Sequence, residues 1–388
     1  KKWVQGRKNL FQKLEESLVP DKPLIWFHCA SLGEFEQGRP LIEALKKEKP
    51  QYQILLSFFS PSGYEIRKNY QHADHVCYLP IDTPAHAKRF IQTTNPSLAI
   101  FVKYEFWYFY LKQLYQNNIP TYLVSGIFRK NQLFFSFFGK AYLKWLSFFD
   151  HLFVQNDDSA EILRKHGIKN ITVSGDTRFD RVNQIASQTK ALPLVERFKN
   201  DHKILIAGSS WPADEELLIE WINNYQSSDW KYIIAPHEIH RHHIEKIIQK
   251  LNQKALRFSE LKPENAFEYN ILIIDNIGML SSLYAYGNIA YIGGGFGQGI
   301  HNILEPATFG IPIIFGPNHK KFQEALELIK RGGAFAISNY NETQQILRSL
   351  TESDPERDKA GRINAGYVAE NKGASNLIIN SLLKRLDK

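Results

Sequence analysis

Cysteine and methionine are scarce in this chain of 388 residues, which contains two cysteines and one methionine. Cys29 and Cys77 each lie in an apolar run and lack the spacing of metal ligands, so we expect buried free thiols in a reduced protein. The histidines between 237 and 243 form a cluster, but no cysteine or carboxylate pattern accompanies them. These absences exclude a disulfide-based scaffold and predict that the chain has no metal site.

Long apolar runs are also absent. No run of about eighteen apolar residues occurs, and the first ten residues lack the apolar core of a signal peptide. The sequence as written therefore predicts no membrane-spanning helix. It begins with Lys1, and its single methionine is Met279. We therefore expect that an N-terminal piece, able to carry a membrane anchor, has been removed.

Basic residues outnumber acidic ones, with 48 Lys and Arg against 40 Asp and Glu and a formal net charge of +8. This excess favours an anionic partner, such as a phosphorylated small molecule, nucleic acid or an acidic membrane surface. No DNA- or RNA-binding module is recognisable, so we do not expect nucleic acid as a partner. With 43% hydrophobic and 23% charged residues, the composition is that of a globular protein and excludes a disordered chain.

Short apolar runs alternate with helical stretches along the chain, for example LIWFHC and LAIFV in the first half and KILIAG and NIAYIGG in the second. Such alternation predicts parallel sheets covered by helices on both faces. A polar stretch at 184–202 separates the halves. We therefore expect two Rossmann-like, doubly wound α/β domains, residues 1–190 and 200–373, that face each other across a ligand cleft. The final helix, 374–388, is expected to pack back on the first domain.

The most informative segment of the second half is residues 288–306, NIAYIGGGFGQGIHNILEP. A strand ends in the glycines 293–295, a loop continues through Gly297, and we expect a helix to begin near residues 301–302. Backbone amides at such a position bind phosphate, whereas the glycine spacing disfavours a nicotinamide dinucleotide. Glu305 can accept hydrogen bonds from a ribose diol. The alternative interpretation is a glycine turn with a solvated glutamate.

Two further loops follow strands of the second half. The loop GSSWPADEE offers the hydroxyl groups of Ser209 and Ser210, and the loop APHEIHRHHI offers His237 and Arg241. Hydroxyl, imidazole and guanidinium groups all bond anions. We expect these side chains to contact an anionic ligand.

Two carboxylates follow strands in the first half. The turn that contains Ser31, Gly33 and Glu34 ends a strand and enters a helix. Side chains at the carboxyl end of a parallel strand line the crevice of a doubly wound fold, so Glu34 is a candidate general base. It could equally be a helix N-terminal glutamate that only interacts with the helix dipole. Glu105 follows the strand at 98–102, among aromatic residues, and is a second candidate.

Aromatic and basic side chains crowd residues 126–150. This segment contains nine Phe, Tyr or Trp residues together with Arg129, Lys130, Lys140 and Lys144. Apolar and basic side chains together predict a helix that lies on an anionic membrane or contacts acyl chains. The alternative is a buried core helix.

Taken together, these segments resemble one known family. The matching segments, in chain order, are HCASLGEFEQGRPLI, YEFW, GDTRFD, GSSWPADEE, DNIGML, GGGFGQGIHNILEPATFGIPIIFGPN and GGA. They resemble the Kdo (3-deoxy-D-manno-octulosonic acid) transferases of Gram-negative lipopolysaccharide assembly, which are glycosyltransferases of the GT-B fold. The resemblance extends over nearly the whole chain, and its most specific part is the pairing of the SxGE turn with the glycine–NxxEP segment.

The resemblance implies an inverting transfer of Kdo from CMP-Kdo to a lipid A precursor, lipid IVA, without a metal ion or a cofactor. Glu34 matches the family carboxylate that takes the proton of the acceptor hydroxyl, and Glu105 matches a later family glutamate. The residues implied to bind substrate in this way, or by their loop positions, are Ser31, Gly33, Ser209, Ser210, His237, Arg241, Gly278, Met279, Leu280, Gly297, Asn302 and Glu305.

Their implied roles differ. Asn302 and Glu305 match the nucleotide-binding pair, with Glu305 at the ribose, and residues 278–280 would meet the base or ribose. Ser209, Ser210 and Arg241 would meet the phosphate or the Kdo carboxylate. Two positions depart from the family pattern: Lys103 replaces the first glutamate of an E-x-E motif, and His237 stands where arginine is common.

The family usually begins with a membrane-anchoring helix, which implies a location at the cytoplasmic face of the inner membrane, with the anionic membrane surface as a partner. Two alternatives remain at this point: a nucleotide-sugar epimerase of the same fold, and a non-catalytic, membrane-associated nucleotide-binding protein. Acceptor-dependent release of CMP from CMP-Kdo would separate all three.

Overall fold

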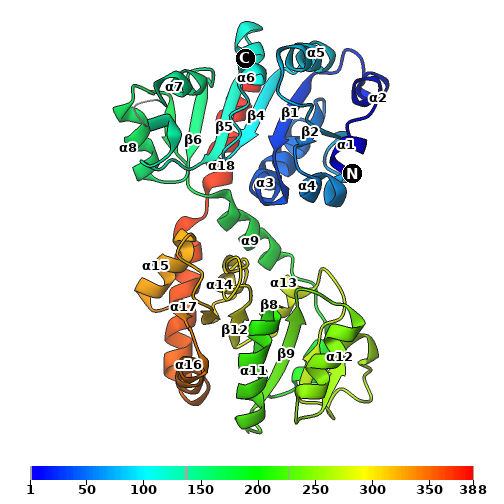
Figure 1. Cartoon of the computed structure of the whole chain (residues 1–388), viewed down its shortest axis with the longest axis vertical. Coiled ribbons are helices and arrows are strands. Elements are labelled where there is room, and N and C mark those ends of the chain that lie inside the picture. The colour runs from blue at the N-terminus through cyan, green and yellow to red at the C-terminus, as the bar shows by residue number, and fades with distance from the viewer. Residues whose placement is uncertain (1, 136–138, 226, 388) are drawn as a thin grey trace. The chain divides into compact units, whose positions relative to one another are not determined.

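The chain folds into two compact units (Figure 1). The structure, a computed structural model, describes residues 2–135, 139–225 and 227–387. Unit 1 contains the residues up to Arg181 together with the C-terminal segment from Asn371, and unit 2 is Val182–Glu370.

Unit 1 is built on a seven-stranded parallel sheet in the order β3-β2-β1-β4-β5-β6-β7. The strands are β1 (Leu24–Cys29), β2 (Gln53–Phe58), β3 (His75–Tyr78), β4 (Leu98–Val102), β5 (Thr121–Gly126), β6 (His151–Val154) and β7 (Ile171–Val173). Every residue of β1, β2, β4 and β5 is buried. Parallel strands covered on both faces have this burial, which explains why their sequences are continuously apolar.

Successive side chains of each strand enter opposite cores. Trp26 of β1 packs in the core that includes α2, α5 and α6, whereas its neighbours Ile25 and Phe27 pack in the core that includes α3 and α18. The helices of unit 1 are α1 (Lys2–Gln5), α2 (Leu10–Ser17), α3 (Leu32–Glu48), α4 (Pro61–Arg67), α5 (Pro84–Thr94), α6 (Tyr108–Gln116), α7 (Lys140–Leu146), α8 (Asp157–Lys165) and α18 (Ala374–Leu386), with a short 3-10 helix η1 (Leu133–Phe135).

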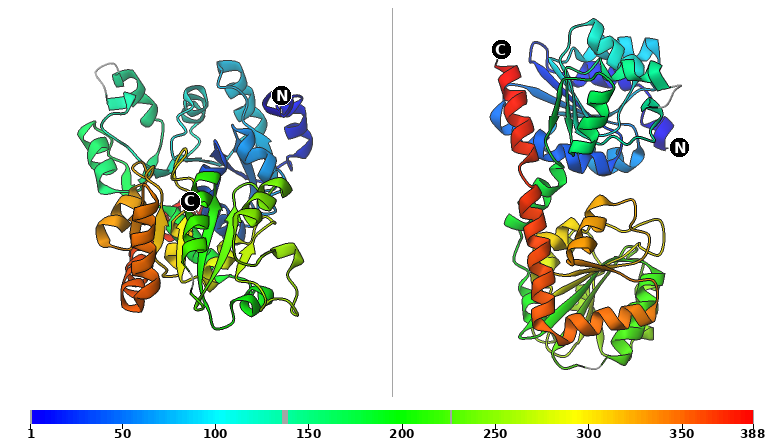
Figure 2. Two further views of the ribbon diagram at one scale, coloured as in Figure 1. Left: turned by 60° about the horizontal axis from the view of Figure 1, so that its bottom comes forward. Right: turned by 90° about the vertical axis from the view of Figure 1, so that its left-hand side faces the viewer.

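Unit 2 repeats this architecture with a parallel sheet in the order β10-β11-β9-β8-β12-β13-β14, again flanked by helices (Figure 2). Its strands are β8 (Lys203–Ser210), β9 (Trp230–Pro236), β10 (Ala255–Arg257), β11 (Ile271–Ile273), β12 (Ile289–Ile292), β13 (Ile313–Phe315) and β14 (Ala334–Ala336). The helices are α10 (Pro193–Lys199), α11 (Pro212–Asn224), α12 (Arg241–Lys250), α13 (Leu280–Leu283), α14 (Leu304–Thr308), α15 (Gln323–Arg331), α16 (Tyr340–Glu352) and α17 (Asp354–Asn371), with η3 (Phe258–Glu260) and η4 (Tyr284–Tyr286). The expected fold class, two doubly wound α/β domains, is therefore confirmed.

Each sheet has one point where the strand order reverses direction. In unit 1 this point lies between β1 and β4, and in unit 2 it lies between β8 and β12. The loops after these strands diverge to opposite faces, which leaves a crevice at the carboxyl end of the sheet where doubly wound folds bind ligands. The two switch points therefore locate the candidate sites.

The units divide earlier than the interval 190–200 expected from the polar sequence. Helix α9 (Thr177–Ser187) spans the division, and residues 193–199 form α10 rather than a linker. Val195 and Phe198 explain the difference, because both are fully buried on one face of α10. The C-terminal helix α18 lies on unit 1, where Ile378 and Leu382 enter the core beside α3.

The aromatic segment 126–150 does not form one continuous helix. Phe128, Phe148 and Phe149 are buried in the core of unit 1. For these three side chains the alternative interpretation, burial in the core, is correct. Trp145 remains partly exposed and packs on Tyr108 with ring centroids 5.3 Å apart. Ser136, Phe137 and Phe138 of this segment lie outside the described residues. In the described ranges, no helix combines the length and hydropathy needed to span a bilayer.

Candidate active site

The two candidate carboxylates of unit 1 lie at its switch point. Glu34 is in the first turn of α3, directly after β1, and Glu105 lies in the loop that follows the neighbouring strand β4. Burial raises the pKa of the Cys29 thiol at the end of β1, and the negative charges of Glu34 and Glu105 raise it further. Both carboxylates therefore lie close to one buried sulfur atom, at the same edge of the sheet.

Glu34 is held by the start of its own helix. Ser31 is the N-cap of α3, and the two side chains form a capping box in which Glu34 Oε2 accepts a hydrogen bond from the Ser31 backbone N–H at 3.0 Å. The Ser31 hydroxyl also donates to this oxygen. The helix N-terminal interpretation is therefore correct for one oxygen of Glu34. The described residues provide no hydrogen bond to the other oxygen, Oε1.

Glu105 is held by one residue of its own loop and one residue of β1. Its Oε2 accepts a hydrogen bond from Trp107 Nε1 at 2.5 Å and lies 3.1 Å from His28 Nε2 of β1. The side chain is buried, with the residue only 8% exposed. As with Glu34, no hydrogen bond joins its Oε1 to the described part of the chain. His28 was not expected at the site, because it lies inside an apolar run that is typical of a core strand.

Two guanidinium groups act electrostatically on Tyr104, which lies next to Glu105 in the loop after β4. Burial raises the pKa of the half-buried Tyr104 phenol. Its electrostatic neighbours oppose one another, because Arg129 and Arg178 lower this pKa whereas Glu34 raises it. Arg178 also binds Asp176, with NH2 2.7 Å from Oδ2. The crevice of unit 1 thus combines carboxylates with guanidinium groups, an arrangement suited to an anionic substrate that must lose a proton.

The GDTRFD segment has a structural role in the same unit. Asp180 accepts hydrogen bonds from the backbone N–H groups of Gly373 and Ser375, at 2.6 and 2.7 Å, and so caps the first turn of α18. Thr177 donates to the carbonyl of Gln37 in α3 at 2.7 Å. This segment therefore connects the C-terminal helix to the helix that carries Glu34.

In unit 2 the switch point presents backbone rather than carboxylates. Asp214 is fully buried in the first turn of α11, where its Oδ2 accepts from Trp211 N at 3.0 Å and Gly294 N at 2.9 Å. Its Oδ1 accepts from the Tyr291 hydroxyl at 2.8 Å. One buried carboxylate therefore joins the loop after β8 to the glycine loop after β12. The sequence analysis assigned no role to Asp214.

The first glycines of this loop are required by close backbone packing. A Cβ atom at Gly293 would lie 2.1 Å from the carbonyl oxygen of Ser209, and one at Gly295 would lie 2.5 Å from the amide nitrogen of Gly316. Neither contact can be relieved by side-chain rotation, since both involve backbone atoms. Gly297 lies further along the loop and has no comparable contact, so its Cα–H face is open.

The expected nucleotide-binding pair lies just after this loop. Helix α14 begins at Leu304, slightly later than the expected 301–302, because the Asn302 side chain accepts from the Leu304 backbone N–H at 3.1 Å and forms the preceding turn. The Asn302 amide also donates to Glu305 Oε1 at 2.9 Å. Burial, and to a smaller extent the charge of Glu305, raises the pKa of the nearby Tyr284. Asn302 and Glu305 are therefore brought together as expected.

The other residues that were expected to contact the donor differ in position and exposure. Gly278 and Met279 end the loop that leads into α13 and Leu280 is the first residue of that helix, at the same carboxyl edge. Ser210 is 1% exposed and donates to Glu215 at 3.0 Å, so Ser209 is the serine that reaches the surface. Arg241 has an 81% exposed side chain that pairs with Glu245 at 2.8 Å, within its own helix.

His237 belongs to a group of stacked rings. It stacks on Trp211 with centroids 4.5 Å apart and on His301 with centroids 4.8 Å apart. Trp211 Nε1 also donates to His301 Nε2 at 3.1 Å, and burial lowers the pKa of His301. Trp211 and His301 were not assigned to the site from the sequence. Their positions directly after β8 and at the end of the glycine loop are the signal that could have identified them.

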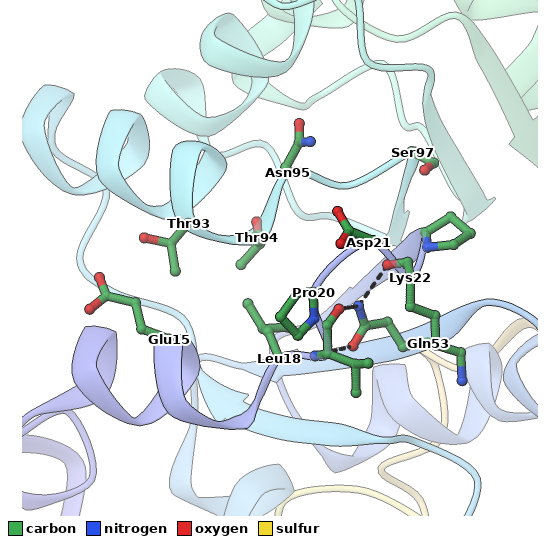
Figure 3. A pocket seen from close by; sticks show the side chains of 12 residues that line it. Glu15, Leu18, Pro20, Asp21, Lys22, Gln53, Thr93, Thr94, Asn95 and Ser97 are labelled. Carbon is green, nitrogen blue, oxygen red and sulfur yellow. Dashed lines mark hydrogen bonds between the residues drawn. The ribbon is translucent and has the colours of Figure 1, made fainter.

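A pocket of about 490 Å³ lies at the opposite, amino end of the unit 1 sheet (Figure 3). It contains Gln53, whose amide donates to the carbonyls of Val19 and Lys22 at 2.9 and 2.7 Å. These bonds hold the turn before β1. None of the expected site residues lines this pocket. Among the described residues, no group of three His, Cys, Asp or Glu side chains could hold a metal ion.

Comparison with solved structures defines the class of protein. A UDP-GlcNAc 2-epimerase from Neisseria meningitidis, bound to UDP-GlcNAc, is similar with a TM-score of 0.64 and 14% identity, covering 93% of this chain and 100% of that one. A calicheamicin glycosyltransferase is similar with a TM-score of 0.60 and 12% identity, covering 95% and 99%. At these identities the likeness concerns the fold alone. The two parallel α/β units are those of the GT-B class.

Comparison of sequences then identifies the family. The family model of 3-deoxy-D-manno-octulosonic-acid transferase (kdotransferase) matches residues 5–181. The match ends at the last residue of the first segment of unit 1, Arg181. The 3-deoxy-D-manno-octulosonic acid transferase of Aquifex aeolicus is 30% identical over 351 residues, covering 89% of each chain. That of Haemophilus influenzae is 26% identical over 383 residues, covering 94% of this chain and 87% of that one. The chain belongs to the Kdo transferase family and is a glycosyltransferase.

Proposed function

We propose that this Kdo transferase moves Kdo from CMP-Kdo to the glucosamine disaccharide of a lipid A precursor, lipid IVA. Unit 1 binds the acceptor and unit 2 binds the donor. The observation that supports this most strongly is the pair of carboxylates at the switch point of unit 1. Glu34 and Glu105 are each held through Oε2, which leaves Oε1 of each available to an acceptor hydroxyl.

The reaction is a single displacement. The acceptor oxygen forms a bond to the anomeric carbon of Kdo while the bond from that carbon to the phosphate oxygen of CMP breaks. CMP departs with the electron pair, and the configuration at the anomeric carbon inverts. Glu34 takes the proton of the acceptor hydroxyl as general base. Glu105 accepts a second hydrogen bond from the acceptor and orients it, and Arg129 balances the acceptor's negative charge.

On the donor side, Glu305 accepts from the ribose hydroxyls while Asn302 orients its carboxylate. The loop 278–280 contacts the base, and Ser209, His237 and Gly297 approach the phosphate and the sugar acid. Buried Asp214 holds the two loops that carry these groups. Backbone amides and basic side chains can stabilise the departing CMP, so the proposed reaction needs neither a metal ion nor a cofactor.

The acceptor also determines where the reaction takes place. A lipid acceptor resides in a membrane, and we propose that the enzyme works at the cytoplasmic face of the inner membrane. The exposed basic residues Arg129, Lys130 and Lys144 and the partly exposed Trp145 would contact its anionic surface. These side chains lie in the same segment of unit 1, beside the acceptor site.

The test is mass spectrometry of lipid IVA incubated with CMP-Kdo and the protein in the presence of EDTA. We expect the lipid to gain the mass of one or more Kdo residues, and we expect CMP release to require the lipid. A reaction without donor is the control. If no mass is gained either with or without EDTA, the proposed donor or acceptor is wrong. A gain that EDTA abolishes would reject the metal-free mechanism.

A further inference from the structure

A series of hydrogen-bonded polar groups lies inside unit 1 and ends at Glu105. Trp26 Nε1 donates to Ser57 Oγ at 2.8 Å, and Ser57 Oγ lies 2.8 Å from His28 Nδ1. His28 Nε2 lies 3.1 Å from Glu105 Oε2. Trp26, His28 and Ser57 are completely buried. Polar groups at such depth are retained only when they are hydrogen-bonded, so the direction of each bond can be worked out.

The donors in this series of hydrogen bonds determine which atoms carry the protons. An indole N–H can only donate, so Ser57 Oγ accepts from Trp26. The single Ser57 proton then goes either to His28 Nδ1 at 2.8 Å or to the Phe27 carbonyl at 3.3 Å. The shorter contact favours Nδ1 as the acceptor. His28 therefore carries its proton on Nε2 and donates it to the Glu105 carboxylate.

Aromatic rings enclose the His28 imidazole and hold its orientation. The rings of Phe101 and Trp107 meet the imidazole edge to face, each with centroids 5.8 Å apart, and Trp26 lies at 6.4 Å. Glu105, which lies against the ring, is the acid group that the imidazole contacts.

We infer that His28, held in turn by Ser57, is a positioning residue that fixes Glu105 Oε2 and thereby directs Oε1 toward the acceptor. This rests on the proposed function, in which Glu105 contacts the acceptor. Glu34 needs no such partner because its own helix cap holds it. Glu105 lies in a loop, two residues after Lys103 with its positive φ of 71°. Its Oε2 is held by Trp107 of the same loop and by His28 of β1, and His28 is the partner that ties the loop to the sheet.

The experiment compares His28→Leu with His28→Gln. Leucine removes both hydrogen bonds, whereas the glutamine amide can still donate to Glu105. At saturating CMP-Kdo we expect His28→Leu to lower kcat by about 100-fold, as misplacement of a reacting group does, with the donor KM little changed. His28→Gln should recover at least about tenfold of this loss. Ser57→Ala should reduce kcat by an intermediate factor.

His75→Leu is the matched control. His75 is also a buried strand histidine of the same sheet, and its Nε2 bonds Gln53 Oε1 at 2.9 Å, away from Glu105. Its variant should lower Tm but leave kcat within about twofold of wild type. If His28→Leu folds and keeps the wild-type kcat, or if His28→Gln is as impaired as His28→Leu, the inference is overturned while the proposed function stands. Should His28→Leu fail to fold, the kcat values of His28→Gln and Ser57→Ala are compared with wild type instead. A wild-type kcat in both variants would overturn the inference.

A second measurement does not depend on activity. Long-range ¹H–¹⁵N correlation spectra distinguish the two neutral tautomers of histidine, and His28 is assigned by the signal lost in His28→Gln. We expect the Nε2-protonated form in the wild-type protein. A proton on Nδ1 alone, or on both nitrogens, would overturn the assignment. Absence of Kdo transfer by the wild type would instead reject the proposed function, so the two failures are distinguishable.

Discussion

The two switch points use acidic side chains in opposite ways. In unit 1, Glu34 and Glu105 follow the strands and each keeps one oxygen without a hydrogen bond from the described residues. In unit 2, Asp214 and Glu215 lie at the corresponding place but are buried and bond inward, to Gly294 N, Tyr291 and Ser210. The same fold thus presents two carboxylates directly after the strands of unit 1. In unit 2 it presents the backbone of the glycine loop directly after β12, with Glu305 further along in α14.

This difference determines what chemistry each site can perform. A carboxylate oxygen that has no hydrogen bond from the described residues can accept a proton. A glycine loop that is anchored by a buried carboxylate can approach a phosphate closely but cannot act as a base. We therefore expect changes in the first site to affect turnover and changes in the second site to affect affinity and stability. The following predictions test that division.

The largest expected effect concerns Glu34. Glutamine at this position can still form the capping box, so Glu34→Gln should fold normally and bind CMP-Kdo near normally. Loss of the general base should lower kcat by a factor on the order of 100 or more. Rates of CMP release and calorimetric titration with CMP-Kdo measure the two quantities. Glu43→Gln, on the same helix, is the control, and an unchanged kcat in Glu34→Gln would remove Glu34 from the mechanism.

Glu34 and Glu105 illustrate how far the sequence predicts this site. Both could be found because each follows an apolar strand, and parallel strands end at one edge. That β1 and β4 are neighbours could not be found, since strand order depends on packing of the whole sheet. His28 was hidden for the same reason. Its partners Ser57 and Glu105 are 29 and 77 residues away, and its own segment is typical of a core strand.

The aromatic segment 126–150 shows a second limit. Its composition indicated a membrane-facing helix, but Phe134 packs on Phe106 at 4.8 Å, and Phe106 also meets the buried Phe149 at 6.3 Å. Aromatic composition does not reveal which rings face one another across a core. The glycine loop, in contrast, was recognisable because only glycine tolerates the backbone contacts at Gly293 and Gly295.

The next prediction concerns Glu305 in unit 2. Glu305→Ala removes an acceptor for the ribose hydroxyls and should raise the Kd for CMP by about 10- to 100-fold, the usual range for a lost charge-assisted pair. At saturating donor, kcat should change little, because the residue lies away from the reacting atoms. Calorimetric titration with CMP measures the affinity. Glu264→Ala removes an exposed glutamate of the same unit as the control, and a wild-type Kd in Glu305→Ala would reject the ribose assignment.

A smaller effect is expected for the buried Asp214. Asparagine supplies only one acceptor oxygen. Asp214→Asn can therefore satisfy the two backbone N–H groups only by turning its amide NH2 toward Tyr291, whose hydroxyl proton then loses its acceptor. We expect the free energy of unfolding to fall by about 2 kcal/mol, and CMP affinity to fall by about tenfold as the glycine loop loses its anchor. Denaturant titration and calorimetry measure these changes. If affinity fell with no loss of stability, Asp214 would act on the ligand directly rather than through the loop.

The smallest expected effect is a pH dependence that originates in unit 2. Burial, together with nearby His237, lowers the pKa of His301 in the folded protein. The unfolded chain therefore takes up a proton more readily, at about the ordinary histidine value of 6.5. The contribution of His301 to stability is thus complete above about pH 6.5 and is lost as the pH falls below that value.

In His301→Gln, whose side-chain oxygen can still accept from Trp211, Tm should decrease less between pH 7.5 and 5.5 than in the wild type. His242→Gln, which removes an exposed imidazole, controls for the loss of a histidine. An identical pH dependence of Tm in wild type and His301→Gln would show that the stacked rings of unit 2 do not couple its stability to protonation.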